Sequence, residues 1–194
     1  LWCTTSLRGN LVGTLDVKVL TEGVHSGTAS GIVPSSFRII RSLLSRIEDH
    51  DTGEILIGEL HEDIPRERQQ QAKIAAEVLA DSVYKKYPWV NCPEKSEQSP
   101  YELLLNNTWR PALSVTGADG LPQNKVAGNV TLPELKLKLS FRLPPTTEPK
   151  SAAEKIKNIL EKNPPENCQI HFNIESAMGG WNAPETAVSY THLT

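Results

Sequence analysis

The stretch Leu135-Lys136-Leu137-Lys138-Leu139-Ser140-Phe141-Arg142-Leu143 alternates apolar and polar side chains from end to end. Alternation with a period of two is typical of a β-strand with one buried face, because successive side chains point to opposite sides of a sheet. Pro144-Pro145 ends the strand, since proline lacks the backbone N–H that a sheet requires. A second, polar face, lined by Lys136, Lys138, Ser140 and Arg142, is therefore left for solvent, a substrate or a partner chain.

Periodic segments on either side of this strand predict the other elements of the fold. Residues 11–20 and 168–175 alternate like strands, and residues 112–116 form a short third strand. An amphipathic helix of about four turns is expected after Pro34. Its inward side chains would be Phe37, Ile40, Leu43, Leu44 and Ile47. The pair Ser151 and Glu154 predicts a capping box that opens a second helix.

An insertion separates the first helix from the second strand. Residues 53–107 contain a helical stretch from Pro65 to about Tyr87, polar at its start, and then a proline-bearing loop over 91–100. Without this insertion the order is strand, helix, strand, strand, helix, strand. That order predicts an α+β fold of the ferredoxin-like, split βαβ type. It has a four-stranded antiparallel sheet with two helices on one face, and a helical insertion after the first helix.

Composition narrows the classes of function. The 194 residues carry a formal net charge of −3, which gives no electrostatic reason to expect nucleic acid or an anionic membrane as a partner. No apolar run approaches the roughly 20 residues needed to span a bilayer. Three scattered cysteines, Cys3, Cys92 and Cys168, suggest reduced thiols and a cytoplasmic protein.

The last residues differ in character from the rest of the chain. Residues 188–194 read Val-Ser-Tyr-Thr-His-Leu-Thr, and they break from the preceding pattern. Their first six positions correspond to one reading frame of a transposase adapter used in DNA library preparation. We expect residues 188–194 to derive from that adapter, and we expect both ends of the chain to be cuts.

The loop Gly23-Val24-His25-Ser26-Gly27, placed between a strand and a helix, is the first candidate for a functional site. A loop histidine often donates a hydrogen bond to a nearby carbonyl, which is the simpler interpretation of His25. The functional interpretation is an imidazole N–H directed at a carbonyl oxygen that gains charge during a reaction. The glycines at 23, 27 and 31 would let the backbone approach a ligand closely.

Two further residues have both a structural and a functional interpretation. Arg142 is either a solvated charge on the polar sheet face or a guanidinium that binds a substrate carboxylate through two parallel hydrogen bonds. Asn129 follows Gly128, a pair that is typical of a turn. The five histidines of the chain include no two at a metal-ligand spacing, so the residues by themselves predict no metal site.

Five segments, taken together and in order, resemble the dimerisation or lid domain of the di-zinc metallopeptidases of the M20 family. They are Thr5-Ser6-Leu7-Arg8-Gly9, Gly23-Val24-His25-Ser26-Gly27, Trp109-Arg110-Pro111-Ala112-Leu113-Ser114-Val115, Gly128-Asn129-Val130, and Leu139-Ser140-Phe141-Arg142-Leu143-Pro144. This family includes carnosine and cytosolic nonspecific dipeptidases, aminoacylase and glutamate carboxypeptidase. The resemblance extends over about residues 1–184.

The resemblance implies roles for particular residues. His25 would reach into the active site of a partner subunit and stabilise the oxyanion of the tetrahedral intermediate. Arg142 would bind the terminal carboxylate of the substrate, and Asn129 would form a hydrogen bond with the substrate. Gly179 and Gly180 match a glycine-rich segment whose backbone lines the substrate site near the return into the catalytic domain.

The resemblance also implies a division of the parent enzyme. Residues 1–9 would end a catalytic domain, residues 10–178 would form the lid, and residues 179–187 would return to the catalytic domain. Two zinc ions would be bound by that missing domain and none by this chain, which alone should be inactive. The expected enzyme is a cytoplasmic, homodimeric hydrolase acting on dipeptides, small peptides or N-acyl amino acids. A stand-alone ferredoxin-like module that binds a small ligand, or a non-catalytic homologue, remains the alternative.

Overall fold

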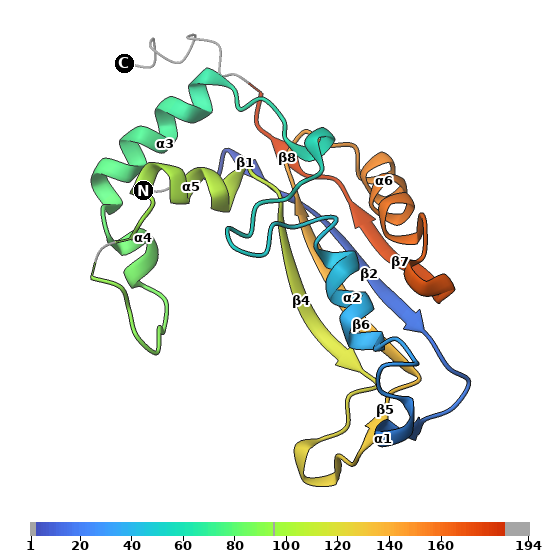
Figure 1. Cartoon of the computed structure of the whole chain (residues 1–194). Helices are drawn as coiled ribbons and strands as arrows, with labels where there is room; N and C mark the ends of the chain where they lie inside the picture. Colours follow the sequence, from blue (N-terminus) through green and yellow to red (C-terminus); the bar gives the residue numbers. More distant parts are fainter. Residues whose placement is uncertain (1–2, 95, 185–194) are drawn as a thin grey trace, which may run out of the picture.

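A four-stranded antiparallel sheet forms the centre of the molecule in a computed structural model that describes residues 3–94 and 96–184 (Figure 1). Its strands lie in the order β4-β6-β2-β7. They span Gly9–Lys18 (β2), Ala112–Asp119 (β4), Glu134–Leu143 (β6) and Gln169–Met178 (β7). The two central strands, β2 and β6, pair over their whole length, from Gly9 opposite Leu143 to Lys18 opposite Glu134.

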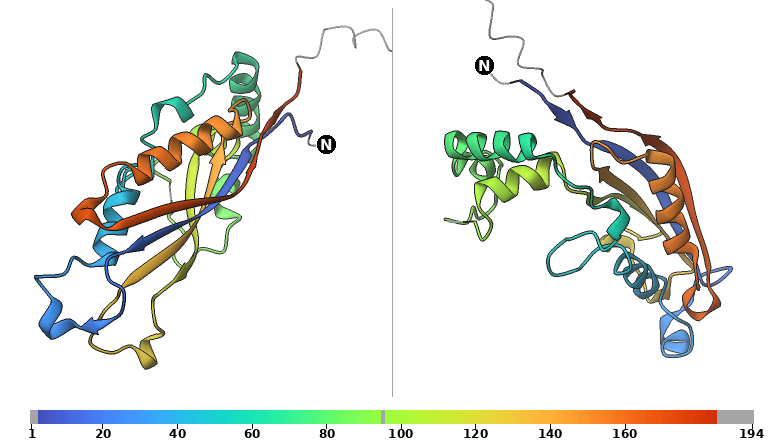
Figure 2. Two further views of the ribbon diagram at one scale, coloured as in Figure 1. Left: turned by 90° about the vertical axis from the view of Figure 1, so that its right-hand side faces the viewer. Right: turned by 90° about the horizontal axis from the view of Figure 1, so that it is seen from above.

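Two amphipathic helices cover one face of this sheet (Figure 2). Helix α2 spans Ser36–Leu44 and contacts β2 and β6, whereas α6 spans Pro149–Glu161 and contacts β7 and β2. The chain order of these elements is β2, α2, β4, β6, α6, β7. The predicted α+β, ferredoxin-like arrangement is confirmed, with both helices on the same side of the sheet.

The core lies between the helices and the apolar side of the sheet. In β2 and β6 every second residue is buried, because the alternation of apolar and polar residues over most of each strand matches the pleat of a sheet. Phe141 and Phe172 meet edge to face with ring centroids 6.5 Å apart. Other fully buried side chains include Leu11, Leu15, Val17, Ile39, Ile40, Leu43, Ile47, Leu135, Leu139, Leu143, Ile156 and Leu160. This single apolar layer holds the sheet and both helices together.

The insertion forms a helical arm that projects from one end of the sheet (Figure 1). It contains a short 3₁₀ turn at Gly58–Leu60 (η1) and the helices α3 (Arg66–Leu79), α4 (Ser82–Lys85) and α5 (Pro100–Thr108). The single expected helix to about Tyr87 is divided in two at Ala80, which has a φ of 43°. Helix α5 was not expected, although Ser99 caps it and Pro100 occupies its first turn.

Two expectations about the covering helices are wrong. Phe37 was expected in the core but is 45% exposed, because the buried side of α2 runs through Ser36, Ile39, Ile40 and Leu43 and turns Phe37 outward. The expected capping box at Ser151 does not form. Helix α6 begins earlier, at Pro149, and the carboxylate of Glu148 accepts the backbone N–H groups of residues 150 and 151.

Two small paired segments lie at opposite ends of the main sheet (Figure 1). At one end, β3 (Val24–His25) pairs with β5 (Val130–Thr131), next to the one-turn helix α1 (Ser26–Ala29). At the other end, β1 (Ser6–Leu7) pairs with β8 (Trp181–Asn182). Two further 3₁₀ turns span Asn124–Val126 (η2) and Pro165–Asn167 (η3). The predicted domain boundaries stay predictions, and residues 188–194 lie outside the described part.

Membrane insertion through a helix finds no support in the described residues. None of the helices there is both long and apolar enough to cross a bilayer.

Candidate functional site

His25 lies at one end of the main sheet, where β3, β5 and α1 meet. Its position there is fixed by contacts within its own loop. Its backbone pairs with Val130, and its carbonyl accepts the hydroxyl of Thr28 at 2.9 Å. Its ring caps α1, because Nδ1 accepts the backbone N–H of Gly27 at 3.1 Å. Gly27 was expected to allow close approach of a ligand. It lies instead against the His25 ring, where an added Cβ would be 2.9 Å from Cε1.

Asn129 lies beside His25 because the β3–β5 pairing brings residues 24 and 25 against residues 130 and 131. The carbonyl of Asn129 accepts the backbone N–H of Ser26 at 2.9 Å. Both side chains are exposed. The structure therefore brings His25 and Asn129 together, more than 100 positions apart in sequence, as one polar group at this end of the sheet.

Arg142 lies near the other end of the sheet, on the face that the helices leave open. It is opposite Asn10 of β2 and Ala112 of β4. Arg8 lies nearby, and its guanidinium donates to the carbonyls of Asn106 and Arg110 at 2.9 and 3.0 Å. Burial, and then the positive charge of Arg142, lower the pKa of Arg8.

Most charges on the open face are neutralised within the chain. Lys136 pairs with Asp16 at 3.2 Å, and Lys138 pairs with Glu175. Within residues 3–94 and 96–184, the side chain of Arg142 makes no hydrogen bond or ion pair, although its backbone pairs with the strands on either side. An exposed guanidinium with a second cation beside it and no partner among these residues favours an anion from outside.

Gly179 and Gly180 connect β7 to β8 at the same end as Arg142. A Cβ on Gly180 would lie 2.6 Å from the carbonyl oxygen of Leu7 and 2.6 Å from Cα of Pro145. Gly180 is thus required by packing between backbones. Gly179 is open, since its nearest neighbour would be Cδ of Pro149 at 3.7 Å.

The predicted site residues form two groups rather than one. His25 and Asn129 lie beyond the first residue of β6, and Arg142, Gly179 and Gly180 lie near its last residue. From Glu134 to Arg142 the strand rises roughly 25 Å at about 3.3 Å per residue. A dipeptide is shorter than that, so one small substrate cannot contact both groups of the same chain.

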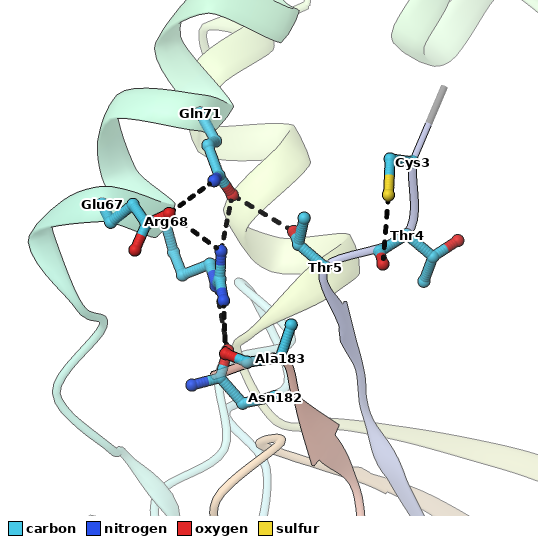
Figure 3. A network of polar contacts seen from close by, with 8 residues as sticks. All are labelled: Cys3, Thr4, Thr5, Glu67, Arg68, Gln71, Asn182 and Ala183. Carbon is cyan, nitrogen blue, oxygen red and sulfur yellow. Dashed lines mark hydrogen bonds and ion pairs between the residues drawn. The ribbon is translucent and has the colours of Figure 1, made fainter. Parts of the chain in front are cut away.

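A buried polar cluster at the base of the helical arm was missed by sequence reasoning (Figure 3). Arg68 is 5% exposed and donates to Asn182 Oδ1 at 2.9 Å, to the carbonyl of Ala183 at 2.7 Å and to Gln71 Oε1 at 3.0 Å. The hydroxyl of Thr5 also donates to Gln71. Helix α3 therefore holds β8 and the residue that precedes β1. The sequence had shown only that the start of this helix is polar.

The family resemblance also implies zinc ions, which require a group of metal-ligating side chains. Among the described residues there is no group of three or more His, Cys, Asp or Glu side chains that could hold a metal ion. The zinc ions that the family resemblance implies do not fit any set of side chains in this part of the chain.

The sheet order and the one-sided helices define an α+β domain of the ferredoxin-like class. Residues 5–168 match the model of the peptidase dimerisation domain of the M20 family, and the chain belongs to that family. It is 28% identical over 159 residues to the Beta-Ala-His dipeptidase of Mus musculus and 26% identical to that of Rattus norvegicus. Both matches cover 81% of this chain and 32% of the relative, so the chain spans about a third of their length.

Solved structures show the same fold. Human carnosine dipeptidase 1 superposes with a TM-score of 0.75 and 21% identity, covering 96% of this chain and 40% of that one. A di-peptidase from Saccharomyces cerevisiae gives 0.72 with 18% identity over 97% of this chain and 40% of its own. A metallo-carboxypeptidase from Sulfolobus solfataricus gives 0.65 with 21% identity over 86% and 38%.

Proposed function

We propose that this chain is the lid and dimerisation part of a homodimeric metallopeptidase that hydrolyses dipeptides, small peptides or N-acyl amino acids. Membership of the M20 family supports the reaction class, and the names of the related proteins support small peptides as substrates. The zinc ions and the attacking water belong to a catalytic domain outside this chain. The chain alone is accordingly inactive, and its free cysteines suit a cytoplasmic enzyme.

The separation of the two residue groups carries this proposal. One copy of the chain supplies Arg142, Gly179 and Gly180 near one end of its sheet, and it presents His25 and Asn129 at the far end. If both groups act on one small substrate, the second group has to come from another subunit. Each active site would then combine Arg142 of one subunit with His25 of its partner.

The side chains have the chemistry that these roles need. Arg142, uncompensated within the described residues, binds the terminal carboxylate of a peptide through charge-assisted hydrogen bonds. The ring of His25 donates to the carbonyl oxygen that becomes an oxyanion, and removal of one such donor costs about 3–4 kcal/mol of transition-state stabilisation. Asn129 is exposed beside His25, so its amide can bond the same substrate.

The two edges of the sheet favour one mode of dimerisation. At the β7 edge, two side chains of α6 bond the backbone of Phe172. Lys157 donates to the Phe172 carbonyl at 2.8 Å, and Glu161 accepts the Phe172 backbone N–H at 2.7 Å. The β4 edge is different, because residues 114–119 are exposed and carry one charge, Asp119. An uncovered strand with few charges is able to pair with another copy. We place the dimer contact along β4 and the neighbouring helix α2.

A subunit-mixing experiment tests the shared site. Full-length enzyme carrying His25→Ala and full-length enzyme carrying Arg142→Ala should each lose about 100-fold or more in kcat/KM. When the two are unfolded and refolded together, half of the dimers should be mixed, and one site in each should be intact. Dipeptidase activity should therefore return to about a quarter of the wild-type value.

The outcomes of mixing separate the possibilities. No return of activity, with mixed dimers demonstrated by mass spectrometry, would show that both residues serve one site within one subunit. Single variants that keep wild-type activity would remove the catalytic assignment altogether. In that case a ferredoxin-like module that binds a small anion through Arg142 becomes the better interpretation.

A further inference from the structure

The hydrogen bond at the ring of His25 determines which nitrogen carries its proton. A backbone N–H can only donate, so Nδ1, which receives the N–H of Gly27 at 3.1 Å, has to present a lone pair. In a neutral imidazole with an accepting Nδ1, the proton is on Nε2. Nε2–H is therefore the donor that remains for a substrate.

Gly27 also limits the position of the ring. A Cβ at position 27 would lie 2.9 Å from Cε1 and 3.1 Å from Nδ1 of His25. Contacts this close force either the ring or the backbone to move, and the backbone is held by the pairing of His25 with Val130. The ring would have to move, and the bond from the Gly27 N–H to Nδ1 would lengthen or break.

We propose that Gly27 is a positioning residue, whose backbone N–H holds His25 as the Nε2–H tautomer and whose missing side chain leaves room for the ring in that orientation. This inference rests on the proposed function for its catalytic consequence. Gly27 touches no substrate. It acts only through His25, by presenting one N–H donor in a fixed direction before the substrate arrives.

Gly128 offers a matched control in the adjacent loop. It precedes Asn129, its φ is not positive, and no atom lies within 4 Å of an added Cβ. Gly128→Ala therefore adds the same methyl group close to the same site without contact with His25. An effect shared by both variants would come from a general disturbance of the two loops. An effect seen only in Gly27→Ala would come from displacement of the His25 ring.

Nitrogen NMR of the histidine rings in the 194-residue chain tests the tautomer directly, without any activity. At a pH where His25 is neutral, wild type and Gly128→Ala should show a protonated Nε2 and an accepting Nδ1. Gly27→Ala should shift the Nδ1 resonance toward that of a free imidazole. A proton on Nδ1 in the wild type overturns the inference. If Gly27→Ala does not fold, the wild-type ring spectrum alone decides between these two results.

Kinetics in the full-length enzyme test the consequence. Gly27→Ala should lower kcat by about 10- to 100-fold and change KM by less than about threefold, because the misplaced donor acts mainly in the transition state. Gly128→Ala should keep both constants. Wild-type kcat in Gly27→Ala would refute the positioning role while leaving the proposed function intact. The proposed function fails separately, through an active His25→Ala.

Discussion

Two glycines, Gly9 and Gly180, lie where the β1–β8 pair joins the four-stranded sheet. They are needed there for close packing of the backbone rather than for flexibility. A Cβ on Gly9 would lie 2.7 Å from the carbonyl oxygen of Met178 and 3.0 Å from the backbone nitrogen of Gly180. Gly180 is similarly enclosed by Leu7 and Pro145. Here β2 and the connection after β7 cross with their backbones in contact, which only residues without a side chain allow. Gly179, one residue away, is free of this constraint.

Substitution by alanine should therefore destabilise the protein at Gly180 but not at the adjacent Gly179. Gly180→Ala should lower the free energy of unfolding by about 2 kcal/mol, because the added methyl group meets backbone that cannot move aside. Gly179→Ala, with open space around it, should change it by less than about 0.5 kcal/mol. Urea denaturation of the chain measures both. Equal stability of the two variants would show that the connection relaxes around Gly180.

The first residue of helix α6 is determined by residues that precede its apolar periodic series. Its apolar side buries Ala152, Ala153, Ile156 and Leu160. The helix nevertheless begins before the first of these, at Pro149, since proline suits the first helical turn. The carboxylate of Glu148 then accepts two N–H groups that have no partner within the helix. Both hydrogen bonds, with Ser151 and then with Lys150, lower the pKa of Glu148.

Stability should consequently depend on pH through this cap. Because the folded-state pKa of Glu148 is lowered, its contribution is present above the ordinary carboxylate value of 4.5 and is lost as the pH falls through the folded value. Glu148→Ala should lower Tm at pH 7, and its difference from wild type should shrink below about pH 4. Differential scanning calorimetry at a series of pH values measures this.

A carboxylate elsewhere on the helix provides the comparison. Glu154 is exposed in the middle of α6, so Glu154→Ala should leave Tm close to the wild-type value at both ends of the pH range. A Tm difference for Glu148→Ala that stays constant with pH would show that the cap does not depend on its charge.

At the scale of the whole molecule, the covered and uncovered sides of the sheet determine what can bind where. Helices α2 and α6 cover one face, and Lys157 with Glu161 satisfies backbone groups at the β7 edge. The β4 edge and the open face stay accessible. The sheet also separates His25 from Arg142 by most of its length, so the proposed site, which uses both residues, requires a second copy.

Dimerisation through β4 should be sensitive to a charge on that edge. Val115 is 50% exposed in β4, and Val115→Lys would place two like charges across a symmetric contact. The dimer dissociation constant should rise by about tenfold or more, equivalent to about 1.4 kcal/mol. Sedimentation equilibrium of the chain measures it. Val90→Lys, at a 98% exposed position in the helical arm, should leave the constant unchanged. Equal constants for the two variants would contradict a β4 interface.

Local periodicity was sufficient to predict the main sheet and its two helices. Strand β6 alternates throughout and β2 over its second half, and each of the two covering helices has one apolar side, so these elements follow from neighbouring residues alone. Predictions made from single positions were less secure. Phe37 belongs to an apolar series yet lies outside the core, because packing against the sheet buried the neighbouring side of α2, which carries Ile39 and Ile40.

The sequence by itself determined the fold class, the family and the identity of the candidate residues, since these depend on local pattern and on ordered motifs. Only the tertiary structure decided their arrangement. The pairing of β3 with β5 joins His25 to Asn129, the length of β6 separates both from Arg142, and the Gly27 N–H orients the His25 ring. These relations join residues distant in the chain or depend on the direction of one hydrogen bond. No periodic pattern along a sequence encodes either.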